Sequence, residues 1–213
     1  MRDDLSESIS QRSNGEKDSE NNRIKKISDD IARRCQLYEA ESGDGKKHVS
    51  PLEIEQRVSE VYAKENHLWM PMSAVFDLGM PGPSGHENDT YVSGNNIFKV
   101  NNLLNSGGVI PLLERVILHN IIFPDTFYFF IGFTGYDGRS VMPVLRQDLI
   151  KDAIPATTVE IDTYMSAIGF TKCSSDGKYQ NKDYIVWDVV PRNVLKDKEG
   201  DMYVVDAEIK CVS

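Results

Sequence analysis

The chain has 213 residues, of which 40% are hydrophobic and 9% aromatic, so it can bury the core of one domain with an appendage. A formal net charge of −9 argues against broad nucleic-acid binding, which depends on lysine and arginine side chains that neutralise phosphates. The sequence has no apolar run of roughly 18 residues, no signal-peptide core and no metal-type spacing among its three cysteines, which predicts a soluble, cytoplasmic protein without a membrane partner.

The N-terminal third divides into a polar segment and two helix signals. Residues 1–22 are almost entirely polar, and they cannot bury enough apolar surface to offset the entropy of ordering, so a disordered tail is expected. A helical extension is predicted over residues 23–66, because apolar residues recur at helical spacing over residues 24–38 and a second helix has Ser50 as its N-cap, with Glu53 three residues later. These helices either pack on their own domain, which is the simpler interpretation, or form a docking surface for another chain.

A glycine-rich segment and a lysine-bearing strand come next. Gly79, Gly82 and Gly85 stand at every third position, a spacing that suits a loop whose backbone approaches phosphate groups, although a plain surface loop explains it equally well. Two strands joined by a tight turn follow, and Lys99 lies in the second, with apolar neighbours that face the opposite way. Burying a lysine costs free energy unless it is paired, so Lys99 is either a paired functional residue or an edge lysine whose charged end reaches solvent.

Helix and strand signals continue along the rest of the chain. The patterns predict a helix over residues 109–119, strands over 128–133 and 140–145, a short helix over 158–168 and an apolar strand over 184–187. The two middle strands would complete a five-stranded sheet in the N-terminal part, which makes the expected fold class α+β.

The segment after the last strand carries the chemistry. Asn193 stands five positions after Asp188, and Asp206 stands thirteen positions after Asn193, with a polar turn between two apolar runs. A hairpin of this kind can bring the three side chains to one point. Phosphoryl transfer requires such a set, in which one carboxylate accepts the proton of the attacking hydroxyl while an amide and a second carboxylate hold Mg²⁺ on the phosphates. The alternative is a surface hairpin whose turn residues are acidic.

The motif Asp188-Val-Val-Pro-Arg-Asn193-Val-Leu, followed by Asp206 at the end of an apolar strand, resembles the catalytic and metal-binding loops of protein kinases. More narrowly, the chain is similar to the kinase-like domain of polyvalent proteins from phages and bacterial mobile elements. The resemblance implies a two-lobed protein-kinase-like fold, with a five-stranded N-lobe over residues 67–150 and a reduced C-lobe over 151–213. It also implies ATP and Mg²⁺ as cofactors and an unknown protein as acceptor or partner.

The resemblance assigns roles to single residues. Asp188 would be the catalytic base, and Asn193 and Asp206 would be the metal ligands. Lys99 would reach the nucleotide phosphates, held by a glutamate on the following helix, where Glu114 is the only acidic residue.

Four further positions would contact the nucleotide through the backbone. Gly82 and Gly85 would lie against the phosphates, and groups near Gln147 and Leu149 would bind adenine at the hinge between the lobes. These positions leave little signature in their side chains.

The chain also departs from the kinase pattern. Val190 replaces a lysine that many protein kinases place near the transferred phosphate, and only seven residues follow Asp206, so the sequence lacks a peptide-binding platform. The sequence therefore predicts an ATP- and Mg²⁺-dependent phosphotransferase, with a serine, threonine or tyrosine side chain of a protein as the default acceptor. The alternative is a pseudokinase that binds a nucleotide or a partner chain without transferring phosphate.

Overall fold

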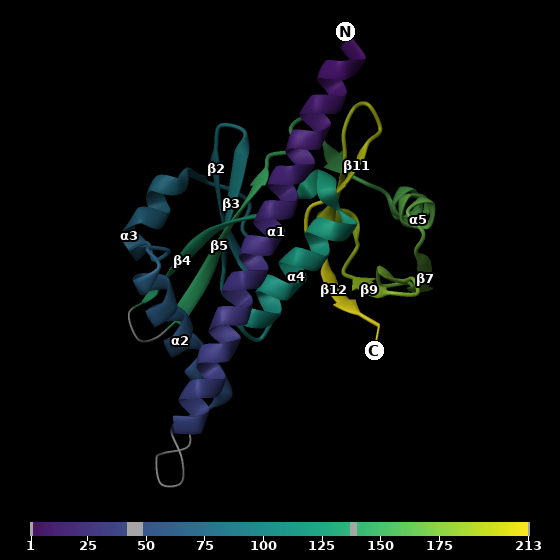
Figure 1. The fold of residues 1–213 in the computed structure, drawn as a ribbon. Helices are drawn as coiled ribbons and strands as arrows, with labels where there is room; N and C mark the ends of the chain where they lie inside the picture. Colours follow the sequence, from purple (N-terminus) through teal and green to yellow (C-terminus); the bar gives the residue numbers. More distant parts are fainter. Residues whose placement is uncertain (1, 42–48, 137–139, 213) are drawn as a thin grey trace. The chain divides into compact units, whose positions relative to one another are not determined.

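The computed structural model describes residues 2–41, 49–136 and 140–212 (Figure 1). The chain forms two compact units, one made of Met1–Ile117 with Tyr128–Gln147 and the other of Leu118–Phe127 with Asp148–Ser213. The passage from the first unit into the second after Gln147 falls within the segment predicted to be a hinge. Residues 118–127, which precede β4 in the chain, also belong to the second unit.

The first unit begins with a long helix, α1 (Arg2–Glu41), where the sequence predicts a disordered tail over residues 1–22. Its inner part is anchored, because Glu20 accepts a 2.8 Å hydrogen bond from the backbone nitrogen of Phe130 and Arg23 donates to the carbonyl oxygen of the same residue. Once the segment from Ile24 onward is docked, further turns extend an existing helix and no new nucleus is needed. Composition alone does not reveal this, since each added turn is polar.

The remaining helical segments of the first unit are shorter. They are α2 (Pro51–Glu65), α3 (Met72–Val75), the 3-10 turn η1 (Phe76–Leu78) and α4 (Val109–Ile122), whose last turns belong to the second unit. Ser50 caps α2 as predicted, accepting a 3.2 Å hydrogen bond from the backbone nitrogen of Glu53, with Pro51 in the first turn. None of the helices in the described ranges combines the length and the apolar content of a membrane span.

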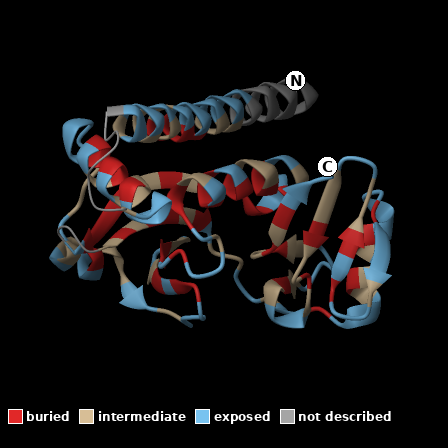
Figure 2. Ribbon diagram, turned by 90° about the horizontal axis from the view of Figure 1, so that it is seen from below, coloured by how far each residue is buried: buried red, intermediate tan, exposed pale blue. Residues whose placement is uncertain are grey.

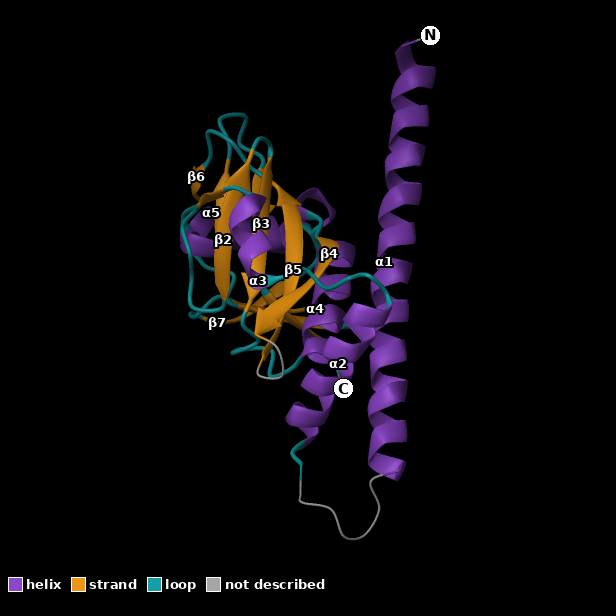
Figure 3. Ribbon diagram, turned by 90° about the vertical axis from the view of Figure 1, so that its left-hand side faces the viewer, coloured by secondary structure: helices purple, strands orange, loops and turns teal. Residues whose placement is uncertain are grey.

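A five-stranded sheet forms the second layer of this unit. Its strands are β1 (Met80–Pro81), β2 (Asn88–Ser93), β3 (Asn96–Asn101), β4 (Phe129–Tyr136) and β5 (Ser140–Asp148), in the spatial order β1-β2-β3-β5-β4. The pairs β1–β2, β2–β3 and β4–β5 are antiparallel, and α4 connects β3 to β4 along the chain. Helices α1 and α2 both contact β4, and Figure 3 shows them beside that edge of the sheet.

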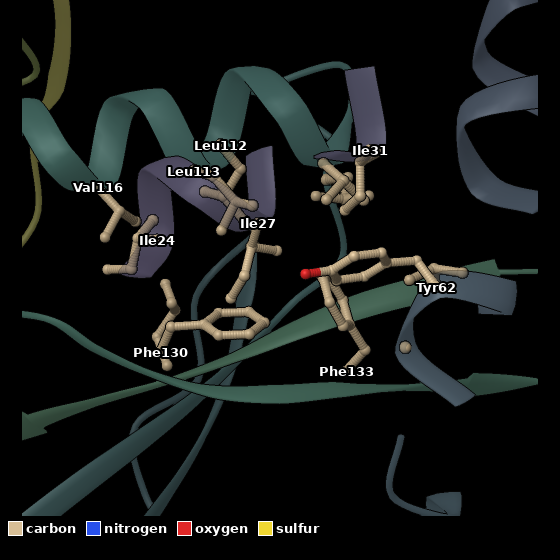
Figure 4. Close-up of a cluster of buried hydrophobic side chains, with 14 of the residues drawn as sticks. Ile24, Ile27, Ile31, Tyr62, Leu112, Leu113, Val116, Phe130 and Phe133 are labelled. Atoms are coloured by element: carbon tan, nitrogen blue, oxygen red, sulfur yellow. The ribbon is translucent and has the colours of Figure 1, made fainter. Parts of the chain in front are cut away.

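The core of the first unit unites α1 with α4 and β4. Figure 4 shows the side chains of these elements pointing toward one another, with those of Ile24 and Ile27 next to Phe130. The rings of Phe130 and Phe133 meet edge-on with centroids 4.9 Å apart. Buried positions of α1 lie along one side of the helix (Figure 2), so the helical extension packs on its own unit, in agreement with the simpler interpretation.

The second unit holds two small sheets and one longer helix. Its elements are η2 (Pro124–Thr126), β6 (Ile154–Pro155), α5 (Thr158–Ala167), β7 (Thr171–Ser174), β8 (Lys178–Gln180), β9 (Tyr184–Trp187), η3 (Pro191–Asn193), β10 (Val194–Lys196), β11 (Met202–Val204) and β12 (Glu208–Cys211). The sheets have the orders β11-β10-β6 and β12-β9-β8-β7. Apolar side chains from both sheets and from α5 form one core, in which Met165, Tyr179 and Val194 are almost completely buried.

Candidate functional site

Asp188 and Asn193 lie in direct contact between β9 and β10. The side-chain nitrogen of Asn193 donates to Oδ2 of Asp188 at 2.8 Å and to the carbonyl oxygen of Asp188 at 2.9 Å. Asp188 has a φ of 60°, in the left-handed region that non-glycine residues seldom adopt. The surrounding contacts hold the carboxylate in one place despite this unfavourable backbone conformation.

Asp206 is brought to the same place by the hairpin of β10 and β11. Val194 pairs with Val204, and one position further out the backbone nitrogen of Val205 donates a 2.9 Å hydrogen bond to the carbonyl oxygen of Asn193. Asp206 therefore directly follows a residue that is bonded to Asn193.

A second strand pairing leads to the same arrangement. β12 pairs with β9, and Glu208 lies opposite Trp187. Asp206 is two residues before Glu208, and Asp188 is one residue after Trp187, so both aspartates lie at the same end of this strand pair. The structure thus gathers the three predicted residues of the hairpin segment at one end of two small sheets.

Carboxylate and amide oxygens, which are present in this cluster, are the atom types that Mg²⁺ takes as ligands in proteins. Because the side-chain nitrogen of Asn193 is bonded to Asp188, its Oδ1 is the amide atom left to bind a cation, and Asp206 adds a carboxylate. Within the described ranges no three His, Cys, Asp or Glu residues come together as a metal site. Two protein oxygens nevertheless suit a Mg²⁺ ion, which keeps several waters and binds substrate phosphates.

The structure adds Arg192 to the predicted residues. Its guanidinium group donates to Oδ1 of Asp188, although the Arg192 side chain is 70% exposed. The sequence carries a signal for this residue, since Arg192 is a cation four positions after Asp188 and two after Val190, where many protein kinases have a lysine.

In the first unit, residues 82–87 form the turn between β1 and β2 and are called the glycine loop. The backbone nitrogen of Gly82 donates to the carbonyl oxygen of Thr90 at 2.9 Å, and a Cβ atom at Gly82 would lie 2.7 Å from Oγ1 of Thr90. Gly85 has open space around it, with no heavy atom within 4 Å of a Cβ built there. Gly82 therefore allows close packing against β2, whereas a side chain at position 85 would meet open space.

Lys99 is buried in β3, at 6% exposure. It does not pair with Glu114, contrary to the prediction. Its Nζ donates a 2.8 Å hydrogen bond to the hydroxyl oxygen of Tyr128 and lies 4.9 Å from the centre of the Tyr128 ring. Glu114 is exposed on α4, because the helix turns its neighbours Leu112 and Leu113 into the core. Glu114 is the only acidic residue of α4, but the sequence does not show which face of the helix is buried.

The buried charge of α4 is Arg115, the next residue. Its guanidinium lies 3.0 Å from Oε2 of Glu87, and both residues are less than a tenth exposed. Glu87 ends the glycine loop just before β2. No sequence motif marks this pair, since its members are 28 residues apart.

The two predicted hinge residues lie where the chain changes units. Gln147 is buried near the end of β5, and Leu149 is half-buried just after that strand. Gln147 is the last residue of its part of the first unit, whereas Leu149 belongs to the second.

Comparison with known proteins identifies a family. Residues 53–213 match the family described as "Serine/Threonine/Tyrosine Kinase found in polyvalent proteins". No curated protein matches the chain. The matched range begins inside α2 and includes every candidate residue described above.

Proposed function

The chain belongs to the family of serine/threonine/tyrosine kinases found in polyvalent proteins, and from this premise we propose that it is an ATP- and Mg²⁺-dependent phosphotransferase with a two-lobed, protein-kinase-like fold. The observation that carries the proposal is the contact of Asn193 with the Asp188 carboxylate beside Asp206. The glycine hairpin, β3 with Lys99, and a helix between β3 and β4 support it further.

In this proposal Asp188 acts on the acceptor hydroxyl. As the hydroxyl oxygen bonds to the γ-phosphorus and the bond to the leaving ADP oxygen breaks, the carboxylate takes the hydroxyl proton. Asn193 keeps the carboxylate oriented through Oδ2, which leaves room for the acceptor on the remaining lone pairs. Arg192, at Oδ1, places a positive charge where the transferred phosphoryl group passes.

Each unit carries residues with a proposed role in nucleotide binding. Asn193 Oδ1 and Asp206 would hold Mg²⁺, which neutralises phosphate charge when bound. Lys99 would add its positive charge. Its ammonium group would be held by the hydroxyl of Tyr128, in the role that the sequence predicts for Glu114. Gly82 and Gly85 would allow the loop backbone to approach the phosphates.

Adenine recognition is assigned to the segment around Gln147 and Leu149, through backbone groups. The acceptor is proposed to be a serine, threonine or tyrosine of a protein, as the family description implies. A pseudokinase that binds the nucleotide without transfer is the second candidate, favoured by Val190 at the position of the usual lysine.

Two measurements test the proposal. Saturating ATP with Mg²⁺, at one hundred times the dissociation constant, should stabilise the protein by about 2.7 kcal/mol, and Asp206→Asn should abolish most of that stabilisation. Transfer of labelled phosphate by the wild type and its loss in Asp188→Asn establish the enzyme. Binding without transfer by the wild type identifies the pseudokinase, and the absence of binding by any nucleotide refutes both candidates.

A further inference from the structure

Glu87 and Arg115 form an ion pair inside the first unit that joins three segments. The carboxylate oxygen Oε2 of Glu87 accepts from the guanidinium of Arg115 at 3.0 Å and from the side-chain nitrogen of Asn105 at 3.4 Å. Asn105 lies in the loop between β3 and α4. The carboxylate of Glu87 therefore connects the end of the glycine loop both to the β3–α4 loop and to the middle of α4.

Backbone contacts reinforce the same junction. The backbone nitrogen of Asn102 donates to the carbonyl oxygen of Glu87 at 2.9 Å, and the side-chain nitrogen of Asn102 donates to the carbonyl oxygen of His86 at 2.9 Å. The last two residues of the glycine loop are thus fixed to the loop before α4. At the other end of the glycine loop, the backbone nitrogen of Gly82 donates to the carbonyl oxygen of Thr90 in the β1–β2 hairpin.

The pair is poorly suited to a purely stabilising role. A buried ion pair seldom adds net stability, because the desolvation of both charges offsets their attraction. Here the other carboxylate oxygen, Oε1 of Glu87, is buried without a hydrogen-bond partner, which adds a further cost. An apolar pair of similar volume would fill the same space without that cost.

We infer that Glu87 and Arg115 are positioning residues that set the glycine loop relative to α4 for phosphate binding. In this role they link α4 to the glycine loop, whereas the sequence predicts a link of α4 to Lys99 through Glu114. The inference rests on the proposed function, since it names the contact on which binding of the ATP phosphates depends. Neither residue touches the reacting atoms in this role.

The role predicts a selective loss of affinity. In Glu87→Leu combined with Arg115→Met, the unit keeps its core but loses the directed link between loop and helix. Affinity for ATP with Mg²⁺ should fall about tenfold, because a link worth about 1.4 kcal/mol is lost. Affinity for adenosine, which has no phosphates, should stay unchanged. In the transfer assay KM for ATP should rise more than kcat falls.

Matched variants separate positioning from folding. Arg115→Lys keeps the charge and should retain most of the ATP affinity, whereas Arg115→Met should lose it. Glu87→Gln, which preserves volume, replaces the double variant if the latter does not fold, and its ATP affinity should fall as well. Glu114→Gln changes an exposed charge on the same helix and should bind ATP like the wild type.

The outcomes are distinct. Unchanged ATP affinity in folded variants of Glu87 and Arg115 overturns the inference while the proposed function stands. Equal losses of ATP and adenosine affinity also overturn it, because they indicate a general structural defect. If the wild type itself binds no nucleotide, the proposed function fails and the inference fails with it.

Discussion

The side-chain amide of Asn193 donates to Oδ2 of Asp188 at 2.8 Å, while the carbonyl oxygen of Asn193 accepts from the backbone of Val205 at 2.9 Å. One residue therefore connects the candidate base to the strand end that delivers Asp206. Because the amide nitrogen is engaged, the amide oxygen is oriented away from Asp188. This orientation makes Asn193 suitable both as a support for the base and as a metal ligand.

Arg192 is expected to affect phosphate transfer more than nucleotide binding. Its guanidinium contacts Oδ1 of Asp188, where charge on the transferred group would develop, so Arg192→Ala should lower kcat by about tenfold, less than the loss of a fully buried donor. Arg192→Lys should lose less, since it keeps the charge. Steady-state kinetics and ATP titration measure the two effects. An unchanged kcat in Arg192→Ala would remove this residue from the mechanism.

Glu55 should make stability depend on pH through the start of α4. Its carboxylate on α2 accepts hydrogen bonds from the backbone nitrogens of Val109 and Ile110. Burial raises the pKa of Glu55 above the ordinary value of 4.5, and the nearby charge of Glu114 also raises it. The folded protein thus holds this proton more tightly than the unfolded chain. The stability that the carboxyl contributes is present below about pH 4.5 and is lost as pH rises through the folded-state pKa.

The matched variant for this effect is Glu55→Gln, which can still accept both backbone hydrogen bonds but does not ionise. Urea unfolding of both proteins should be measured from pH 4.5 upward. The free energy of unfolding of the wild type minus that of Glu55→Gln should decrease as pH rises. An increase of this difference with pH would contradict the sign of the effect.

The contact of α1 with the core should be essential for stability. Ile31 is fully buried, so Ile31→Ala should lower the free energy of unfolding by about 2–5 kcal/mol. Leu37, on the same helix, is 52% exposed, and Leu37→Ala should change it by less than about 0.5 kcal/mol. Similar small effects of both substitutions in denaturant unfolding would show that α1 does not belong to the cooperative core.

The three cysteines should react with thiol reagents at different rates. Burial, followed by the charges of Glu55 and Glu39, raises the pKa of Cys35 to about 11, so almost no thiolate is present at pH 8. Cys173 and Cys211 are exposed. A timed colorimetric thiol assay should therefore show two fast thiols and one slow one, and Cys35→Ser should remove only the slow phase. A fast phase that disappears in Cys35→Ser would contradict the expected order.

The features that sequence predicts best are local. Ser50 and Glu53 are three residues apart, and their cap forms as expected because a helix start depends on its own first turn. The spacing of Asp188 and Asn193 likewise encodes a contact within one short loop. In both cases the residues that decide the geometry are neighbours along the chain.

Longer-range relationships could not be predicted from this one sequence. Whether Glu114 or Arg115 faces inward depends on how α4 is rotated against β4 and α1, a packing outcome that composition does not encode. Arg115 pairs with Glu87, which lies in the loop before β2 and is separated from α4 by two strands along the chain. The helical start of α1 could not be predicted for a related reason, since its polar turns precede a segment that is held by tertiary contacts.

The outer edge of β4 has no neighbouring strand in the five-stranded sheet, yet its backbone is occupied at two points. Side chains of Glu20 and Arg23 bond both backbone groups of Phe130, and the segment of Leu68 and Met70 bonds those of Phe133 at 2.8 Å. An uncovered strand edge can pair with the edge of another molecule. Because α1 occupies part of this edge, a chain shortened by that helix would expose backbone groups of β4 that can pair with another strand, and we expect it to self-associate.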